Sequence, residues 1–189
     1  MKRLNDQIRN FIPWNEQEKR DREVLLRWLD SGVDIATRDN PVAHLTASAW
    51  VVSPGRKFVL MAYHNLYDSW AWLGGHADGD LDLQAVATRE AREESGIQNV
   101  KPLMDGPISL EILTVDGHEK KGEYVSSHLH LNLTYLFEAE IGQALTNKPD
   151  ENSAVAWIPV EEIAARSTEP WFIKRIYSKL CAKVQQMTE

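Results

Sequence analysis

The sequence is poor in the residues and segments that define several classes of protein. Cys181 is the single cysteine among 189 residues, which excludes an internal disulfide and a cysteine-rich zinc site. No apolar run approaches the roughly 18 residues that a membrane-spanning helix needs, and no apolar core typical of an export signal follows the first residues. We therefore expect a cytoplasmic protein that does not associate with membranes.

Positive charge is also in short supply. The chain has 21 Lys and Arg residues against 28 Asp and Glu residues, a formal net charge of −7. Nonspecific binding of nucleic acids or anionic membranes needs a basic patch, so neither is expected as a partner. Because of this negative net charge, a polyphosphate substrate has to be bound through a local cation. The hydrophobic content of 43% is ordinary for a globular protein.

The most informative segment joins a pair of glycines to an acidic helix. Gly75 precedes a stretch in which Glu90, Glu93 and Glu94 are spaced at i, i+3 and i+4. Their side chains therefore project from one side of a helix, where like charges destabilise the isolated helix. A bound divalent cation is the simplest compensation, and carboxylate oxygens are the ligands that Mg²⁺ or Mn²⁺ prefers. The segment predicts a metal-dependent phosphate enzyme.

The alternative interpretation is a solvated helix face. On such a face a pair like Arg89 with Glu93 contributes only about 0.2–0.5 kcal/mol. The glycines on either side favour the metal site instead. Gly75 permits a close approach that a side chain would block, and Gly96 is well placed to end the helix in a left-handed conformation.

From Gly75 to Ile97 the sequence resembles the signature of the Nudix hydrolase family. The matching positions are Gly75, Arg89-Glu90, the apolar Ala91, Glu93-Glu94 and Gly96-Ile97. One position departs, because the first glutamate of the signature falls on Leu81, between Asp80 and Asp82. Either aspartate can replace that glutamate or cap the helix. The matching order of strands extends the resemblance over roughly residues 42–165.

The resemblance implies a hydrolase that cleaves a phosphoanhydride bond in a nucleoside diphosphate linked to another moiety. It implies that Glu90, Glu93 and Glu94 bind Mg²⁺ or Mn²⁺ together with the backbone carbonyl of Gly75, and that Arg89 orients the glutamates. Such ions position the substrate and neutralise its charge. The expected partner is a small nucleotide-type diphosphate, whose identity the signature does not specify. Homodimers are common in the family, so a homodimer is one assembly that the resemblance allows.

The general base is expected outside the signature, where its position varies among family members. Glu151 is the first candidate, because its loop precedes a predicted strand, and Glu123 is the second. For either residue taken singly, a solvated loop carboxylate is the simpler interpretation.

Two rival functions remain open. Isopentenyl diphosphate isomerases share the fold but use a catalytic cysteine in a strand-associated loop, whereas Cys181 belongs to a predicted terminal helix. The other rival is a Nudix-like module that binds a nucleotide as a sensor without cleaving it. Degenerate signatures usually lose the Glu-Glu pair, and this sequence keeps Glu93 and Glu94.

Histidines form a second group of candidate residues. His128 and His130 alternate along a predicted strand and so share one face. They are compatible with a zinc pair, but the sequence places no third soft ligand near them. A face lining the substrate cleft and a buried, hydrogen-bonded pair are the other interpretations. His44 and His76 are candidates for contact with phosphate.

Hydrophobic periodicity predicts a mixed α/β chain. Helices are expected at 4–12, 16–30, 160–165 and 170–186, and strands at 43–52, 58–63, 70–73, 108–116, 125–139 and 154–158. With the helix of the signature, this order favours a Nudix-type α/β/α sandwich with a mixed sheet. We expect an N-terminal helical extension at residues 1–40 and a Nudix hydrolase domain at 41–189. The extension is expected to pack against the core or a second subunit, or to contribute to specificity.

Overall fold

The computed structural model describes residues 2–120 and 122–187. The helices are α1 (Lys2–Asn10), α2 (Glu16–Asp30), α3 (Leu83–Ser95), η1 (Val160–Glu162), α4 (Ile163–Arg166), α5 (Pro170–Phe172), η2 (Ile173–Tyr177) and α6 (Ser178–Gln186). The strands are β1 (Ala43–Val52), β2 (Phe58–His64), β3 (Ser69–Ala71), β4 (Leu73–His76), β5 (Lys101–Pro102), β6 (Ser109–Val115), β7 (His118–Lys120), β8 (Glu123–Val125), β9 (His128–Glu138) and β10 (Asn152–Pro159). Among these residues no helix has both the length and the apolar character that crossing a bilayer requires.

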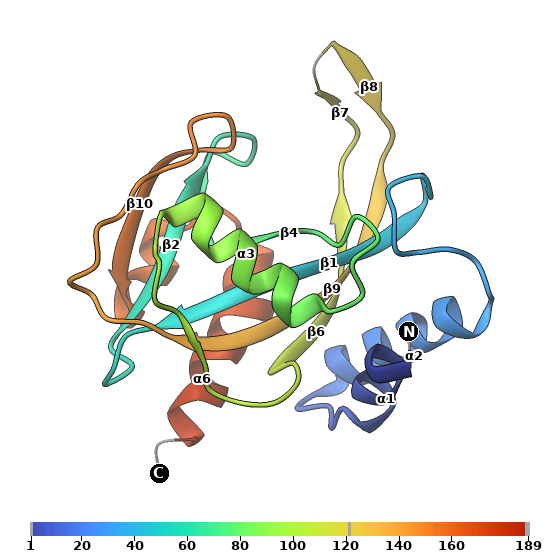
Figure 1. Cartoon of the computed structure of the whole chain (residues 1–189), viewed down its shortest axis with the longest axis horizontal. Coiled ribbons are helices and arrows are strands. Elements are labelled where there is room, and N and C mark those ends of the chain that lie inside the picture. Colours follow the sequence, from blue (N-terminus) through green and yellow to red (C-terminus); the bar gives the residue numbers. More distant parts are fainter. Residues whose placement is uncertain (1, 121, 188–189) are drawn as a thin grey trace.

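The architecture is an α/β/α sandwich, as predicted. β1 and β9 run parallel at the centre of the main sheet, and the other neighbouring strands pair antiparallel. Figure 1 shows α3 in front of this sheet and α6 behind it, with β7 and β8 projecting as a separate hairpin. The helices α1 and α2 form the expected N-terminal extension.

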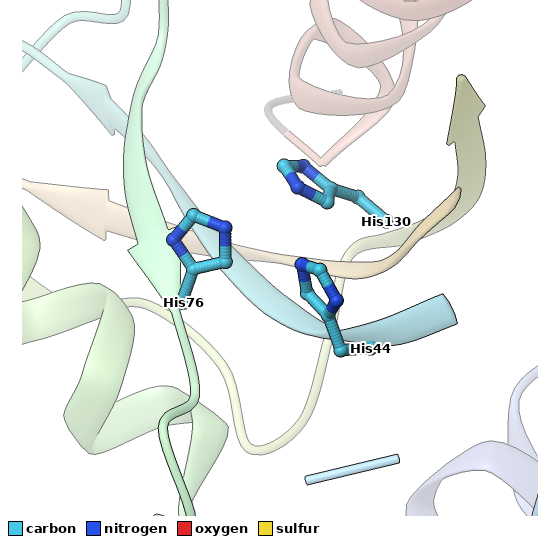
Figure 2. Close-up of side chains that lie close together, drawn as sticks. All are labelled: His44, His76 and His130. Atoms are coloured by element: carbon cyan, nitrogen blue, oxygen red, sulfur yellow. The ribbon is translucent and has the colours of Figure 1, made fainter. Parts of the chain in front are cut away.

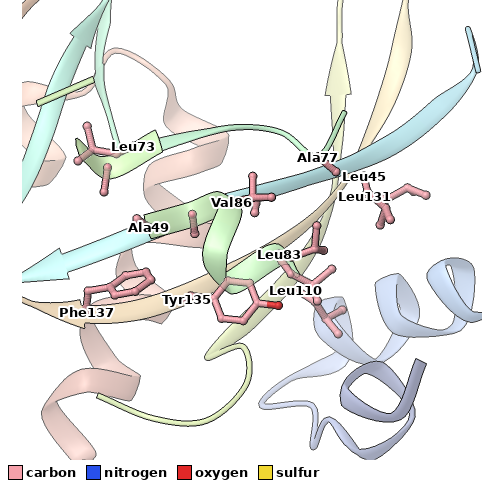
Figure 3. Packing of buried hydrophobic residues seen from close by; sticks show 14 of the residues in the cluster. Leu45, Ala49, Leu73, Ala77, Leu83, Val86, Leu110, Leu131, Tyr135 and Phe137 are labelled. Carbon is pink, nitrogen blue, oxygen red and sulfur yellow. The ribbon is translucent and has the colours of Figure 1, made fainter. Parts of the chain in front are cut away.

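The central strand β1 is buried along its whole length. Its odd-numbered residues, Leu45 and Ala49 among them, join the hydrophobic cluster under α3 (Figure 3). Trp50 and Val52 join a second cluster with residues of η2 and α6. Because successive side chains of a strand point to opposite faces, one strand supplies both cores.

The helix α3 begins and ends with the residues that the sequence indicated. The side chain of Asp82 accepts a hydrogen bond from the backbone of Ala85 at 3.2 Å and so caps the first turn. Gly96 ends the helix in the left-handed conformation, with φ of 73°. Its buried stripe contains Leu83, Val86, Ala87 and Ala91. Capping is therefore one role of the acidic residues that flank Leu81.

The strand predicted at 70–73 is divided in the structure. Its first part, β3, pairs with β2, whereas β4 pairs with β1 through Leu73, Gly74, Gly75 and His76. The division arises because one edge of β1 is shared: β4 occupies its first part, and β2 pairs only with Val51 and Val52. The glycine pair is thus part of the sheet and not a free turn.

The N-terminal helices share the core of the sheet. Leu4 and Ile8 of α1 and Leu25 of α2 belong to the same buried cluster as the apolar side of α3. The boundary between an extension at 1–40 and a domain at 41–189 stays a prediction. In the structure these helices pack against the core, which is one of the roles expected for them.

A buried group of charged residues joins α2, β6 and α6. Glu18 of α2 lies 3.2 Å from Lys179 and 2.6 Å from Lys183, both on α6, measured between Oε1 and Nζ. Glu111 of β6 lies 3.0 Å from Lys179. Ser109 donates a further hydrogen bond to Glu18 at 2.7 Å. The two carboxylates are fully buried, so each depends on these partners for compensation.

Glu18 is the centre of this buried charge cluster. Burial opposes its ionisation, but the adjacent charges of Lys179 and Lys183 outweigh that effect and hold the pKa of Glu18 below its ordinary value of 4.5. The backbone of Trp14 donates a hydrogen bond to the other carboxylate oxygen at 2.7 Å. The ionised form is therefore the native one at neutral pH.

We predict that Glu18→Gln lowers the free energy of unfolding by about 3–5 kcal/mol at pH 7, because it removes the carboxylate that compensates the buried Lys183. The folded pKa of Glu18 lies below 4.5, so its contribution is complete above that pH and is lost as pH falls through the folded pKa. The difference between wild type and variant should therefore shrink in acid. Urea unfolding across pH measures both effects. Glu16→Gln, on an exposed position of the same helix, is the control and should change little; an equal loss in the two variants contradicts the prediction.

Candidate active site

The glycine strand β4 lies directly against the glutamates of α3. A Cβ built on Gly75 would stand 2.5 Å from Cδ of Glu90, a separation that folded proteins do not tolerate. The backbone N–H of Gly74 donates a hydrogen bond to Oε2 of Glu94 at 2.8 Å. The absence of a side chain at Gly75 is thus what allows the Glu90 carboxylate to occupy this place.

The three glutamates differ in exposure although they adjoin one another. Glu94 is only 4% exposed, and burial raises its pKa to about 8, with Glu90 and Glu151 adding to the rise and the Gly74 hydrogen bond opposing it. Burial and the neighbouring Glu93 also raise the pKa of Glu90. These directions indicate carboxylates that lack sufficient positive charge nearby.

Two basic side chains lie beside the glutamates. Arg89 contacts Asp80 at 3.5 Å, Glu90 at 3.8 Å and Glu93 at 4.0 Å. Lys148 contacts Glu93 at 3.8 Å and Glu151 at 3.0 Å. Arg89 was expected here, whereas the sequence analysis did not identify Lys148. The available signal was its position three residues before Glu151 in the same loop.

The loop that carries Glu151 is fastened to the end of α3. Asn152, which is fully buried, donates a hydrogen bond from Nδ2 to the backbone oxygen of Glu94 at 3.1 Å. The backbone oxygen of Glu151 accepts a hydrogen bond from Asn65 at 3.0 Å. The negative charge of Glu151 consequently contributes to raising the pKa of both Glu90 and Glu94. Glu123 instead lies on β8 in the separate two-stranded sheet (Figure 1).

The donor set at this place suits a hard divalent cation. Carboxylate groups come from three positions of one helix, and Gly75 packs directly against one of them, Glu90. Oxygen ligands of this kind are those that Mg²⁺ and Mn²⁺ prefer. A bound cation would also favour the ionised forms of Glu90 and Glu94, which burial and the neighbouring carboxylates disfavour. The residues present therefore fit the metal that the sequence indicated.

The histidines gather at a second place. His44 of β1, His76 of β4 and His130 of β9 each offer a ring nitrogen, and these atoms lie within 4.8 Å of one another. Figure 2 shows the three rings converging from the three strands. The sequence analysis found no third soft ligand near His128 and His130, and this expectation was wrong. The parallel register places His44 opposite His130, a contact that sequence distance conceals.

We predict that alanine at the two adjacent glycines has different effects. At Gly74 a Cβ meets backbone atoms, the oxygen of Ala47 at 2.7 Å and Cα of Ser48 at 2.9 Å, so Gly74→Ala should cost about 1–3 kcal/mol of stability through overpacking. At Gly75 it meets only the flexible end of Glu90, so Gly75→Ala should displace that carboxylate at a smaller cost. Urea unfolding of both variants measures the difference, and equal losses would contradict it.

Solved structures share this fold at low sequence identity. A hydrolase of the NUDIX family from Clostridium perfringens matches with a TM-score of 0.55 and 17% identity, covering 76% of this chain and 97% of that protein. The E. coli dihydroneopterin triphosphate pyrophosphohydrolase matches with a TM-score of 0.55 and 15% identity, covering 73% and 94%. A Nudix hydrolase from M. smegmatis matches with a TM-score of 0.50 and 15% identity, covering 77% and 85%.

No curated protein matches the sequence significantly. The family model described as the NUDIX domain matches residues 42–180, a range that contains β4, α3, the Glu151 loop and the histidines. This match covers most of the chain and agrees with the architecture and with the glycine–glutamate packing. The chain therefore belongs to the NUDIX family of hydrolases.

Proposed function

We propose that the protein is a Mg²⁺- or Mn²⁺-dependent hydrolase that cleaves a phosphoanhydride bond in a nucleoside diphosphate linked to another moiety. The observation that carries this proposal is the packing of Gly75 against Glu90, in which the carboxylate occupies the place that a side chain at position 75 would take. Glu90, Glu93 and Glu94 and the Gly75 carbonyl are the proposed metal ligands. The bound cation would neutralise phosphate charge on a protein whose own net charge is −7.

The remaining residues have proposed roles that follow from their contacts. Glu151 accepts a proton from the attacking water, which forms a bond to one phosphorus while the bridging P–O bond breaks and the bridging oxygen leaves with the other phosphate. Lys148, at 3.0 Å, holds the Glu151 carboxylate. Arg89 orients Glu90 and Glu93 through its contacts with both. Gly74 fixes Glu94 by a hydrogen bond of 2.8 Å.

We predict metal-dependent hydrolysis of at least one member of a panel of nucleoside diphosphate derivatives, with a loss of at least about 100-fold in kcat for Glu93→Gln. Glu93 is half-exposed, so removal of its charge should leave the fold intact, as thermal unfolding can check. The measurement is phosphate or nucleotide release with and without Mg²⁺. Undiminished activity in Glu93→Gln contradicts the site. Binding that raises the melting temperature without cleavage favours the sensor alternative.

We predict that Glu151→Gln lowers kcat by about 10²–10⁴-fold, the usual contribution of a general base, and alters the pH dependence of kcat. Glu123→Gln is the matched control, because Glu123 belongs to the β7–β8 hairpin. Steady-state kinetics of the two variants across pH decide between the candidates. A loss in Glu123→Gln with normal activity in Glu151→Gln would reverse the assignment.

A further inference from the structure

Four of the six histidines of the chain meet on the side of the sheet opposite the glutamates. Gly75 faces Glu90, and the next residue of β4, His76, therefore points to the other face. There its ring lies 5.1 Å from that of His44 and 4.9 Å from that of His130, between centroids. The histidine cluster and the carboxylate cluster thus adjoin the same strand without sharing a ligand side chain.

Two of these histidines have one ring nitrogen fixed by a backbone carbonyl. Nδ1 of His44 lies 3.3 Å from the oxygen of Asn40, and Nδ1 of His128 lies 2.8 Å from the oxygen of Ser126. A carbonyl accepts only, so each Nδ1 carries the proton and each Nε2 presents a lone pair. Histidines that bind metals commonly have this arrangement, because the hydrogen bond orients the ring and selects its tautomer.

The ring nitrogens of these histidines lie close together. Nε2 of His44 is buried and has no hydrogen-bond partner among the described residues, which is costly for a polar atom unless a ligand compensates it. Nε2 of His128 accepts a hydrogen bond of 3.2 Å from Nε2 of His130, because the proton of His128 is on Nδ1. Ligand nitrogens at about 2.0–2.1 Å from a tetrahedral zinc ion stand about 3.3 Å apart. The His44, His76 and His130 nitrogens, within 4.8 Å, need only a modest contraction.

We propose that His44, His76 and His130 bind a divalent first-row transition-metal ion of the Zn²⁺ type, with His128 beside them as the hydrogen-bond partner of the His130 ring. Imidazole suits such ions, whereas Mg²⁺ prefers oxygen and is the ion proposed for the carboxylate cluster. His44, His76 and His130 come from β1, β4 and β9, so the ion would link the three strands. Two of these strands, β1 and β4, position the glycine pair. His76 and His130 are partly exposed, which gives the ion a route from solvent.

The histidine site is independent of the proposed hydrolase activity. Its ligands are nitrogens on one face of β4, and the proposed magnesium ligands are oxygens on the other. Zinc binding by the histidines therefore does not require that Glu93 be intact, and hydrolysis by the glutamates is measured separately with Mg²⁺. Failure of one proposal leaves the other testable.

The test is titration of Zn²⁺ into the full chain, prepared without a polyhistidine tag and stripped of metal, against a chromophoric chelator in excess Mg²⁺. We expect one Zn²⁺ per chain, a rise in melting temperature, and an X-ray absorption spectrum with nitrogen ligands at about 2.0–2.1 Å. His76→Ala and His130→Ala should each weaken zinc binding by at least about 100-fold, more than the loss of a supporting group costs.

Matched controls separate this site from other zinc ligands. His64→Ala removes a histidine at the end of β2, whose ring contacts Tyr67, and Glu93→Gln alters the carboxylate cluster; both should keep wild-type zinc affinity. The proposal is overturned if zinc does not bind stoichiometrically, or if Glu93→Gln abolishes binding while the His76 and His130 variants retain it. If these histidine variants fail to fold, the wild-type spectrum decides, because an oxygen-dominated shell excludes the site.

Discussion

The arrangement of this molecule depends on the close pairing of a short, side-chain-poor strand, β4, with the central strand β1. Gly74 and Gly75 pair with Ser48 and Ala47, and the missing side chains let α3 approach until Glu90 and Glu94 touch the strand. Only glycine permits so close an approach of other atoms to the backbone. The position of the carboxylates is therefore a consequence of packing as much as of helix periodicity.

The same pairing separates two kinds of chemistry across one strand. The face of β4 toward α3 meets carboxylates, which suit hard cations, and the opposite face meets imidazoles, which suit softer ones. His76 follows Gly75 directly, so the alternation of side chains along a strand is sufficient to divide the two clusters. In this fold the nitrogen atoms of the histidines therefore lie on one face of β4 and the carboxylate oxygens of the signature lie on the other.

The N-terminal helices belong to this arrangement through both apolar and ionic contacts. Leu4, Ile8 and Leu25 complete the core that also receives α3. Glu18 forms an ion pair with Lys183 of α6, and both side chains are buried, so each charge depends on the other for compensation. The helices α2 and α6 both contact β6, through Ser109 with Glu18 and through Glu111 with Lys179. The strand β6 in turn pairs with β9, which carries His128 and His130.

The sequence by itself determined the local features: the helix of the signature with an aspartate cap and the Gly96 terminus, the strand at 43–52, and the fold class. These follow from periodicity and capping, which depend on residues a few positions apart. Only the tertiary structure decided which distant residues meet. Lys148 lies between Glu93 and Glu151, Glu123 belongs to the separate β7–β8 sheet, and His44 and His76 join His128 and His130. Such contacts are set by strand pairing and register, and a register shift of one residue would reverse the face that every side chain occupies.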